Sequence, residues 1–367
     1  MNKREEYLKT IARQQAKPIP YFFKLCKAVE DKFEAKYGHT NYPDFYDIPL
    51  REVFIRPTKL NIEDRFTKYL SSREVQGDIT EWGIELKKSS VEHFSTMIGP
   101  LHDALDLQDI EDLPLPDFLE DYRWEGVAQE IQTLKEQGKI TFTGIYGGHD
   151  TGGSANIVPA FMDIFESAWY LRGLDNMLMD FYLREEFAVK LLDKVTELKV
   201  QLAKKWTSAG IDIIVTADDV GTQKGLMMSP DIYRKLIKPR LGKVIDAAKS
   251  VNEDVLIFYH SDGDIEEIIP DLIEIGVQIL NPIQPECMDP KKVKSQYIDK
   301  ISFWGTVGTQ TTLPFGTPEE VKAFCSEMMS HVSKTGGLVL GPTHLVEPEV
   351  PLENIEAYLE AIKEHNQ

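Results

Sequence analysis

From about residue 139 onward, short apolar runs alternate with longer segments of helical periodicity. This alternation is typical of βα units and a parallel sheet. The runs are apolar at successive positions, as expected for strands buried between an inner core and outer helices. We predict strands at KITFTGIY (139–146), IDIIVTA (211–217), DVLIFYH (254–260), VQILNP (277–282), KISFWGT (300–306) and GLVLGPTH (337–344). An N-terminal run, KPIPYFF (17–23), is a further candidate.

The helices between these runs begin with recognisable capping residues. Ser229, Asp289 and Thr317 each precede a proline, and Thr317 with Glu320 matches a capping box. The segment after the third strand has one apolar face at helical spacing, formed by Ile265, Ile268, Ile269, Leu272 and Ile273. Pro270 lies within that segment, so we expect a kink or a fresh helix start there.

Six or seven strands joined by helices fit either an open doubly wound sheet or a closed barrel. An open dinucleotide-binding sheet needs a GxGxxG turn after its first strand, and GGHDTGG (147–153) has a different spacing. We therefore predict a (β/α)8 TIM barrel. Because no repeat or linker divides the chain, we predict one domain over residues 1–367. Residues 1–75 are expected to form a helical and loop extension packed on the barrel.

The composition narrows the class of protein. With 42% hydrophobic residues the chain can bury a large core. A net charge of −19 and scattered lysines and arginines oppose nucleic-acid binding, which needs a concentrated basic face. No apolar stretch is long enough to span a membrane, and the start lacks a signal-peptide apolar region. Three cysteines without CxxC spacing fit a reducing compartment, so we expect a cytoplasmic protein.

Polar residues follow most of the predicted strands. In a barrel the carboxyl ends of the strands share one face, and active sites lie there. The residues past the strand ends are His149 and Asp150, Asp218 and Asp219, His260 and Asp262, Gln284, Glu286 and Cys287, Thr306 to Gln310, and His344. This concentration predicts an enzyme whose site lies at that face.

Structural roles compete with functional ones at several of these positions. Asp218 and Asp219 could cap the turn into the next helix, and His149 could be an ordinary loop residue in its glycine turn. Cys287 could be a small buried residue, because no basic group near it in the sequence would lower its pKa. The histidines that end the third and last strands could be core residues. Two histidines from different strands at one mouth nevertheless favour a function.

Two kinds of chemistry fit these residues. His260, Asp262 and His344 could supply three zinc ligands and leave an open position. Alternatively, the two histidines and Asp218 could donate protons and anchor a polar heterocycle. The His-x-Asp motif is too short to decide between them.

Six segments of the chain resemble the uroporphyrinogen decarboxylase superfamily. They are EWGIELKK (81–88), PLHDALDLQDIEDLPLPD (100–117), DDVGTQKGLMMSPDIYRKLIKP (218–239), FYHSDGDIEEIIPDLIEIGVQILNPIQP (258–285), FWGTVGTQTTLPFGTPEEV (303–321) and GPTHLVEPEVPLENIEAY (341–358). The resemblance covers roughly residues 75–365 and implies a single (β/α)8 barrel with its cleft at the carboxyl face. It is closest to the methyltransferase branch, whose members move a methyl group between a small donor, a corrinoid protein and an acceptor such as a thiol or tetrahydrofolate.

The resemblance also marks departures from family patterns. The decarboxylases carry an arginine-rich N-terminal signature that residues 17–38 lack, and a charge of −19 disfavours an eight-carboxylate substrate. The thiol-methylating branch has His-x-Cys and a last cysteine, where this chain has His260-Ser261-Asp262 and His344. A thiol-activating zinc is therefore less supported. A His/Asp/His zinc site stays open, with Glu286 or Cys287 in reserve.

A zinc-free site would instead suit a pterin, held through paired hydrogen bonds by carboxylate and amide side chains. The residues expected to be catalytic are Asp218, His260 and His344. The residues expected to bind substrate are His149, Asp219, Asn281, Gln284 and Gln310.

The resemblance therefore implies a methyltransferase that acts in methyl transfer or demethylation with a corrinoid-binding partner protein carrying cobalamin. Tetrahydrofolate is the candidate co-substrate and zinc the candidate metal. The alternatives are decarboxylation of the uroporphyrinogen type and a non-catalytic barrel that binds a corrinoid or pterin. The methyl donor, the acceptor and the direction of transfer are left open by the sequence.

Overall fold

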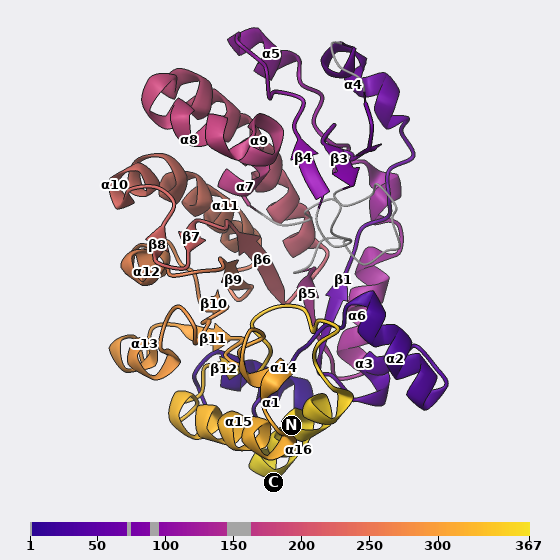
Figure 1. The fold of residues 1–367 in the computed structure, drawn as a ribbon, viewed down its shortest axis with the longest axis vertical. Helices are drawn as coiled ribbons and strands as arrows, with labels where there is room; N and C mark the ends of the chain where they lie inside the picture. Colours follow the sequence, from indigo (N-terminus) through magenta and orange to yellow (C-terminus); the bar gives the residue numbers. More distant parts are fainter. Residues whose placement is uncertain (1, 72–74, 89–94, 145–162) are drawn as a thin grey trace.

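A computed structural model describes residues 2–71, 75–88, 95–144 and 163–367 of the chain. Its centre is a seven-stranded parallel sheet that curls on itself, with helices on the outside (Figure 1). The strands in sheet order are β1 (Leu50–Val53), β5 (Ile140–Thr143), β6 (Ile213–Ala217), β9 (Leu256–His260), β10 (Ile279–Asn281), β11 (Ser302–Trp304) and β12 (Leu338–Val339). The fold is a TIM-barrel α/β fold, as predicted, and each of the six predicted strands is present in a shorter form.

An N-terminal segment links the two edges of the curled sheet. Tyr21 and Leu25 form isolated parallel bridges with Leu340 and Val346, just beyond β12. On the other side, the ammonium group of Lys24 lies 3.1 Å from a carboxylate oxygen of Glu52 in β1. The run predicted as a strand over 17–23 thus forms no regular strand. The chain there makes two isolated bridges, at Tyr21 and at Leu25.

Strand β1 is the part of the barrel that the sequence pattern did not predict. Its four residues, LREV, are buried only at the two ends, and Arg51 and Glu52 interrupt any apolar run. The range 1–75 does contain the expected helices, α1 (Lys3–Ile11), α2 (Lys27–Tyr37), α3 (Tyr42–Phe45) and α4 (Ile62–Leu70). The extension is therefore not separate from the barrel, because the same range supplies β1 to the sheet.

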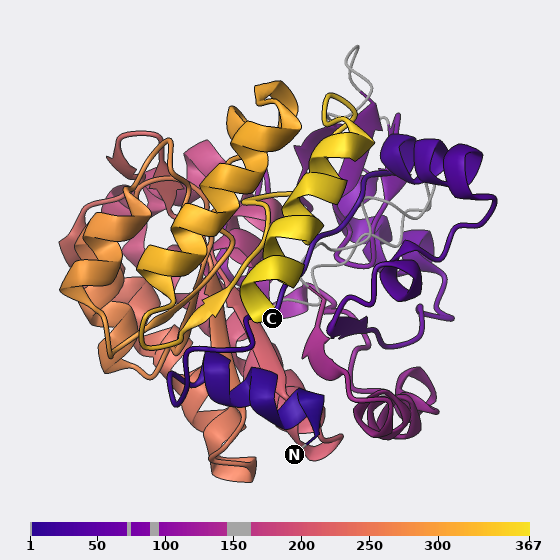
Figure 2. The ribbon, with the colours of Figure 1, turned by 90° about the horizontal axis from the view of Figure 1, so that it is seen from below.

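Helix α1 lies across the N-terminal end of the barrel, below the helices α15 (Pro318–Val332) and α16 (Leu352–Asn366) in Figure 2. The backbone amide of Gly337 donates to the carbonyl of Thr10 (2.7 Å), and the hydroxyl of Ser302 donates to that of Ile11 (2.6 Å). Both contacts are made at or next to the first residue of a strand, so the N-terminal end is covered and the carboxyl end is left for a site.

The barrel interior is packed with aromatic rings. The ring of Trp304 lies 5.5 Å from that of Phe22, 5.2 Å from that of Phe142 and 5.1 Å from that of Phe258, all edge to face. Such pairs add to the stabilisation from burial. The barrel is thus a filled core, and chemistry is confined to its mouth.

The outer helices begin where the capping residues predicted. Ser229 accepts a hydrogen bond from the amide of Ile232, and Asp289 accepts from the amides that follow it. Thr317 and Glu320 form the complete capping box. Pro270 lies in the first turn of α12 (Ile269–Glu274), which confirms the fresh start expected there.

The remaining α-helices in the described ranges are α5 (Leu107–Asp112), α6 (Val127–Glu136), α7 (Phe165–Arg172), α8 (Leu174–Leu183), α9 (Glu185–Ser208), α10 (Pro230–Ile232), α11 (Lys238–Val251), α13 (Pro290–Gln296) and α14 (Thr312–Phe315). Short strands form a second sheet, β2 (Asp78–Ile79), β3 (Glu85–Lys88) and β4 (Ser95–Ile98), and a hairpin, β7 (Gly221–Thr222) and β8 (Gly225–Leu226). Within the described ranges, no helix combines the length and apolarity needed to cross a membrane.

Candidate active site

The site is built from three neighbouring strands that end at the same level. Ala217 of β6 is in register with His260 of β9, and His260 is in register with Asn281 of β10. The residues after Ala217 are Asp218 and Asp219, so two carboxyl groups arrive beside the histidine. Strand register, which the sequence pattern does not specify, thus brings together groups that lie some sixty residues apart.

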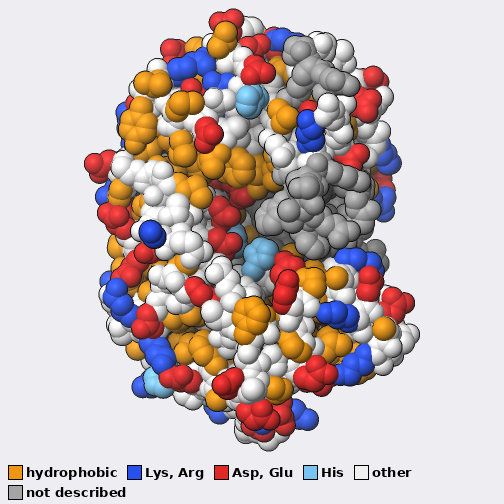
Figure 3. Space-filling view, viewed as in Figure 1, with side chains coloured by type: hydrophobic (Ala, Val, Ile, Leu, Met, Phe, Trp, Pro, Cys, Tyr) orange, Lys and Arg blue, Asp and Glu red, His pale blue; other side chains and the backbone are white. Residues whose placement is uncertain are grey.

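Asp219, His260 and Asp262 form the centre of the site. Each offers one potential ligand atom, and the three atoms lie within 4.8 Å of one another. Nε2 of His260 is 3.5 Å from Oδ1 of Asp219, which also accepts a hydrogen bond from the amide of Asp262 (2.9 Å). Among the described residues, no group donates to the buried Oδ1 of Asp262. Acidic and histidine side chains gather in a hollow in the middle of this face (Figure 3).

The other ring nitrogen of His260 is held by Asn281. Nδ1 lies 2.6 Å from the side-chain oxygen of Asn281, whose amide nitrogen donates to the carbonyl of Trp304 (2.7 Å). His260 was predicted to be catalytic and Asn281 to bind substrate, and the structure brings them into direct contact.

The charges of the cluster act on one another. Burial lowers the pKa of His260, but the carboxylates of Asp219 and Asp262 and the bond with Asn281 outweigh it, so the pKa is raised. Burial raises the pKa of Asp262, and the nearby carboxylate adds to this, while His260 and His344 oppose it. The ring therefore tends to hold a proton, and the Asp262 carboxyl gives one up less readily than an exposed aspartate.

Asp218, which was predicted to be catalytic, is directed through one oxygen toward the start of α7, and among the described residues its other oxygen has no donor. Its side chain is fully buried, and its Oδ1 accepts hydrogen bonds from the amides of Ile164 (2.9 Å) and Glu166 (2.8 Å) at the start of α7. Burial and the carboxylate of Asp163 raise its pKa well above the usual value, against the effect of these amides. It caps a helix, as the competing interpretation allowed, but that helix precedes it in the chain.

A buried acidic group behind the cluster was missed by the sequence analysis. The carboxylate of Asp163 pairs with the ammonium group of Lys199 at 2.7 Å, and both side chains are fully buried. Glu166 accepts a hydrogen bond from the hydroxyl of Tyr170. Burial, followed by the carboxylates of Asp219 and Asp163, raises the pKa of Glu166 well above its usual value. These residues belong to the start of α7 and to α9, and a search of strand ends could not find them.

His344 was the third predicted zinc ligand. It is half-buried and close enough to lower the pKa of Asp262, but it is not one of the three residues in the tight cluster. Asp219, predicted to bind substrate, occupies that third position. The difference arises because Asp219 follows β6, the strand next to β9, whereas His344 follows β12, three places away in the sheet.

The other predicted residues lie around the cluster. Gln284 accepts a hydrogen bond from the amide of Gly263 (2.8 Å), which fixes the turn after His260. Glu286 accepts from Thr311 (2.9 Å). Gln310 is exposed, and His149 lies outside the described residues.

Cys287 is half-buried, and its thiol contacts the side-chain oxygen of Gln223 (3.3 Å). Burial and nearby carboxylates, first that of Glu286, raise the pKa of this thiol. A raised pKa opposes formation of the thiolate that would bind metal or attack a substrate. The structure thus gives Cys287 the environment of a structural residue.

Comparisons with known proteins agree with the fold. The family described as uroporphyrinogen decarboxylase (URO-D) matches residues 93–365. A uroporphyrinogen decarboxylase from Coxiella burnetii is 20% identical over 358 residues, which cover 96% of this chain and 86% of that protein. The solved structure of a methyltransferase from Methanosarcina mazei is similar over 100% of both chains, with a TM-score of 0.68 and 18% identity. At this identity the structural likeness concerns the fold alone.

Proposed function

The chain belongs to the uroporphyrinogen decarboxylase family, and from this premise we propose that it is a methyltransferase of a corrinoid-dependent system. It would move a methyl group between a small donor or a pterin such as tetrahydrofolate and the cobalamin of a corrinoid-binding partner. The observation that carries the proposal is the cluster of Asp219, His260 and Asp262 at the barrel mouth. It offers a proton-holding imidazole and metal-binding oxygens, and it contains no lysine or arginine.

The charge of the mouth argues against a porphyrinogen with many carboxylates. Six segments follow the strands β5 to β12 of the main sheet, namely residues 144–163, 218–229, 261–265, 282–289, 305–311 and 340–350. Together these segments contain one lysine or arginine, Lys224. On the β1 side, Lys24 pairs with Glu52 and Arg56 pairs with Glu125. A polyanion would meet mainly carboxylates in these segments, with few cations to pair with it. A neutral or positively charged methyl-bearing group suits this mouth better.

The chain's own residues would supply orientation and proton control. Transfer from a donor requires the heteroatom that loses the methyl group to be protonated or polarised, and transfer to a pterin nitrogen requires loss of a proton there. Nε2 of His260, 3.5 Å from Asp219, is the atom that would hold or release that proton. The aromatic core below the cluster excludes water from one side, and the open side would receive the corrinoid partner.

The residues also fit a zinc ion. The orphaned Oδ1 of Asp262, Nε2 of His260 and a carboxylate oxygen of Asp219 would hold it, and Asn281 occupies Nδ1 as partners of ligating histidines do. Bound zinc would supply a Lewis acid that polarises an oxygen or nitrogen of the substrate. Elemental analysis of the purified protein is expected to show zinc near stoichiometry. Zinc that persists in a His260→Ala, Asp262→Ala double variant would exclude this ligand set.

The direct test is an assay with methylcobalamin and tetrahydrofolate. We expect the cobalt–carbon bond to break with its electron pair staying on cobalt, while the methyl group replaces the proton of a pterin nitrogen. The cobalamin spectrum reports the first change and mass spectrometry of the folate the second. Release of carbon dioxide from uroporphyrinogen without methyl transfer would overturn the proposal in favour of decarboxylation. Tight binding of both reagents without turnover would instead favour a carrier protein.

A further inference from the structure

One polar chain crosses three neighbouring strands beneath the mouth. It runs from the imidazole of His260 on β9, through the side-chain amide of Asn281 on β10, to the backbone carbonyl of Trp304 on β11. Nδ1 of His260 lies 2.6 Å from the side-chain oxygen of Asn281, and the side-chain nitrogen of Asn281 lies 2.7 Å from the carbonyl oxygen of Trp304. Asn281 is 2% exposed, so its amide has little access to water and depends on these partners.

The direction of each hydrogen bond in this chain is determined by chemistry. A backbone carbonyl can only accept, so the NH2 group of Asn281 must face Trp304. The carbonyl oxygen of the Asn281 side chain must then face His260, and it too can only accept. Nδ1 of His260 therefore carries a hydrogen, and in the neutral ring the lone pair lies on Nε2.

The backbone next to Trp304 provides the space that this arrangement needs. Gly305 has φ of 83°, a conformation that favours glycine. A Cβ at this position would lie 3.0 Å from the amide nitrogen of Asn281 and 3.0 Å from the carbonyl of Pro342. Any side chain at residue 305 would thus press on the amide that holds His260.

We propose that Asn281 is a positioning residue that fixes His260 in its Nδ1–H tautomer and so aims the Nε2 lone pair between Asp219 and Asp262. The assignment differs from a substrate-binding role for Asn281, because both ends of its amide are already engaged within the protein. Its use in catalysis rests on the proposed function. The tautomer itself can be measured without any turnover.

Nitrogen-15 NMR of histidine-labelled protein tests the proposal at a pH where the ring is neutral. The His260 signals are identified by their loss in His260→Gln. We expect the wild type to show a protonated Nδ1 and an unprotonated Nε2, and Asn281→Leu to populate the opposite tautomer. Because the partner of a ligating histidine affects metal binding, Asn281→Leu should also weaken zinc binding by about 10–100-fold.

Two further variants separate positioning from general damage. Asn281→Asp keeps an acceptor for Nδ1–H and should retain the wild-type tautomer. Asn354→Leu is the matched control, because Asn354 is also buried and donates to backbone carbonyls, those of Leu313 (2.7 Å) and Gly316 (2.9 Å), neither of which belongs to the chain that holds His260. It should change neither the tautomer nor the zinc affinity, even if it lowers the melting temperature as much.

A protonated Nε2 in the wild type, or an unchanged tautomer in folded Asn281→Leu, would overturn the assignment. An equal loss of zinc affinity in Asn354→Leu would also overturn it, since the effect would then be one of stability. If the wild type shows the Nδ1–H tautomer but binds no zinc, the role of Asn281 stands and the metal site falls. If methyl transfer fails while the tautomer shift is observed, the proposed function alone is rejected.

Discussion

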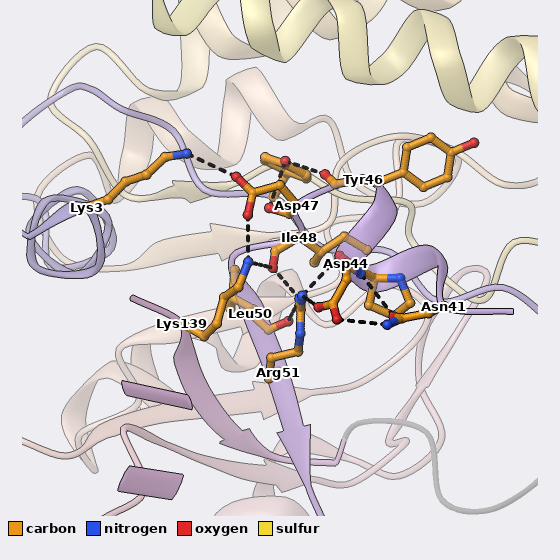
Figure 4. Close-up of polar contacts among 11 residues, drawn as sticks. Lys3, Asn41, Asp44, Tyr46, Asp47, Ile48, Leu50, Arg51 and Lys139 are labelled. Atoms are coloured by element: carbon orange, nitrogen blue, oxygen red, sulfur yellow. Dashed lines mark hydrogen bonds and ion pairs between the residues drawn. The ribbon is translucent and has the colours of Figure 1, made fainter. Parts of the chain in front are cut away.

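At the N-terminal end of the barrel the carboxylate of Asp47 lies between two ammonium groups, those of Lys3 (3.2 Å) and Lys139 (2.6 Å) (Figure 4). At the carboxyl end the carboxylate of Asp262 faces that of Asp219, and among the described residues nothing donates to its Oδ1. An aspartate is thus paired with two cations at one end of the barrel. At the other end an aspartate faces a second carboxylate.

Other charged residues at the two ends of the barrel differ in the same way. Near the N-terminal end Asp212 pairs with Arg4 and Lys135 and accepts from the amide of Thr141 (2.9 Å). At the mouth lie carboxyl groups whose pKa values are raised, among them those of Asp262 and Glu166. Paired charges hold the strand starts in place, whereas unpaired ones cost stability and are kept for binding or chemistry. The comparison predicts that substitutions at the two ends will have opposite consequences for activity and stability.

The largest effect is expected for His260→Ala. Removing the imidazole takes away the atom proposed to hold the proton or the metal, so methyl transfer should fall by about 10²–10⁴-fold. The rate of methylcobalamin consumption measures the loss. His102→Ala is the control, because that ring is exposed and bonds only to its neighbour Asp103 among the described residues. Equal activity of the two variants would contradict the placement of the site.

Asp212→Ala should cause the largest loss of stability. It leaves Arg4, Lys135 and the amide of Thr141 without their shared partner, so the free energy of unfolding should fall by about 3 kcal/mol. Urea unfolding measures this. Asp219→Ala is the matched substitution at the mouth and should cost less than about 1 kcal/mol, because it also removes repulsion from Asp262. A larger loss for Asp219→Ala would reverse the comparison.

Changes of pH should act on the two ends in opposite directions. Burial raises the pKa of Asp47, but hydrogen bonds from Lys139 and Lys3 outweigh it and lower the pKa below its usual value. Its stabilising contribution is present above the usual carboxyl pKa and is lost as the pH falls through the lowered value. Burial, with the carboxylate of Asp163, raises the pKa of Asp218, so the native protein holds a proton that the unfolded chain releases. That contribution is lost as the pH rises above the usual carboxyl pKa.

Asp218→Asn should therefore reduce the loss of stability at higher pH. The slope of unfolding free energy should become shallower by up to about 1.4 kcal/mol per pH unit between the usual carboxyl pKa, where the unfolded chain releases its proton, and the raised pKa of native Asp218. Urea unfolding from about pH 5 to about pH 9 measures this slope. Asp47→Asn should leave the slope at high pH unchanged, and a parallel curve for Asp218→Asn would show that the buried carboxyl is already ionised.

The smallest effect is expected for Asp47→Ala. The side chain is 66% exposed, so solvent screens both ion pairs and the loss should be below about 1 kcal/mol. Unfolding in high salt should shrink the difference from the wild type further. A loss as large as that of Asp212→Ala would mean that exposure does not distinguish the two networks.

Much of the architecture followed from local patterns. The apolar runs predicted six strands, the caps at Ser229, Asp289 and Thr317 predicted helix starts, and both were confirmed because these signals lie within a few neighbouring residues. The placement of His260 at a strand end was equally local. Strand β1 was not predicted because Arg51 and Glu52 occupy its middle positions. It is a strand only because it pairs with β5 in the sheet.

The partners of the polar residues were decided only by the tertiary structure. The sequence analysis predicted Asp218 and His344 to be catalytic and His344 to be a zinc ligand as well. The fold buries Asp218 against α7 and sets Asp219 beside His260. Glu166 joined the site without any signal in the sequence. The type of a residue and its place at a strand end can be determined from the local sequence. Its burial, its hydrogen bonds and hence its pKa depend on which distant strands and helices pack next to it.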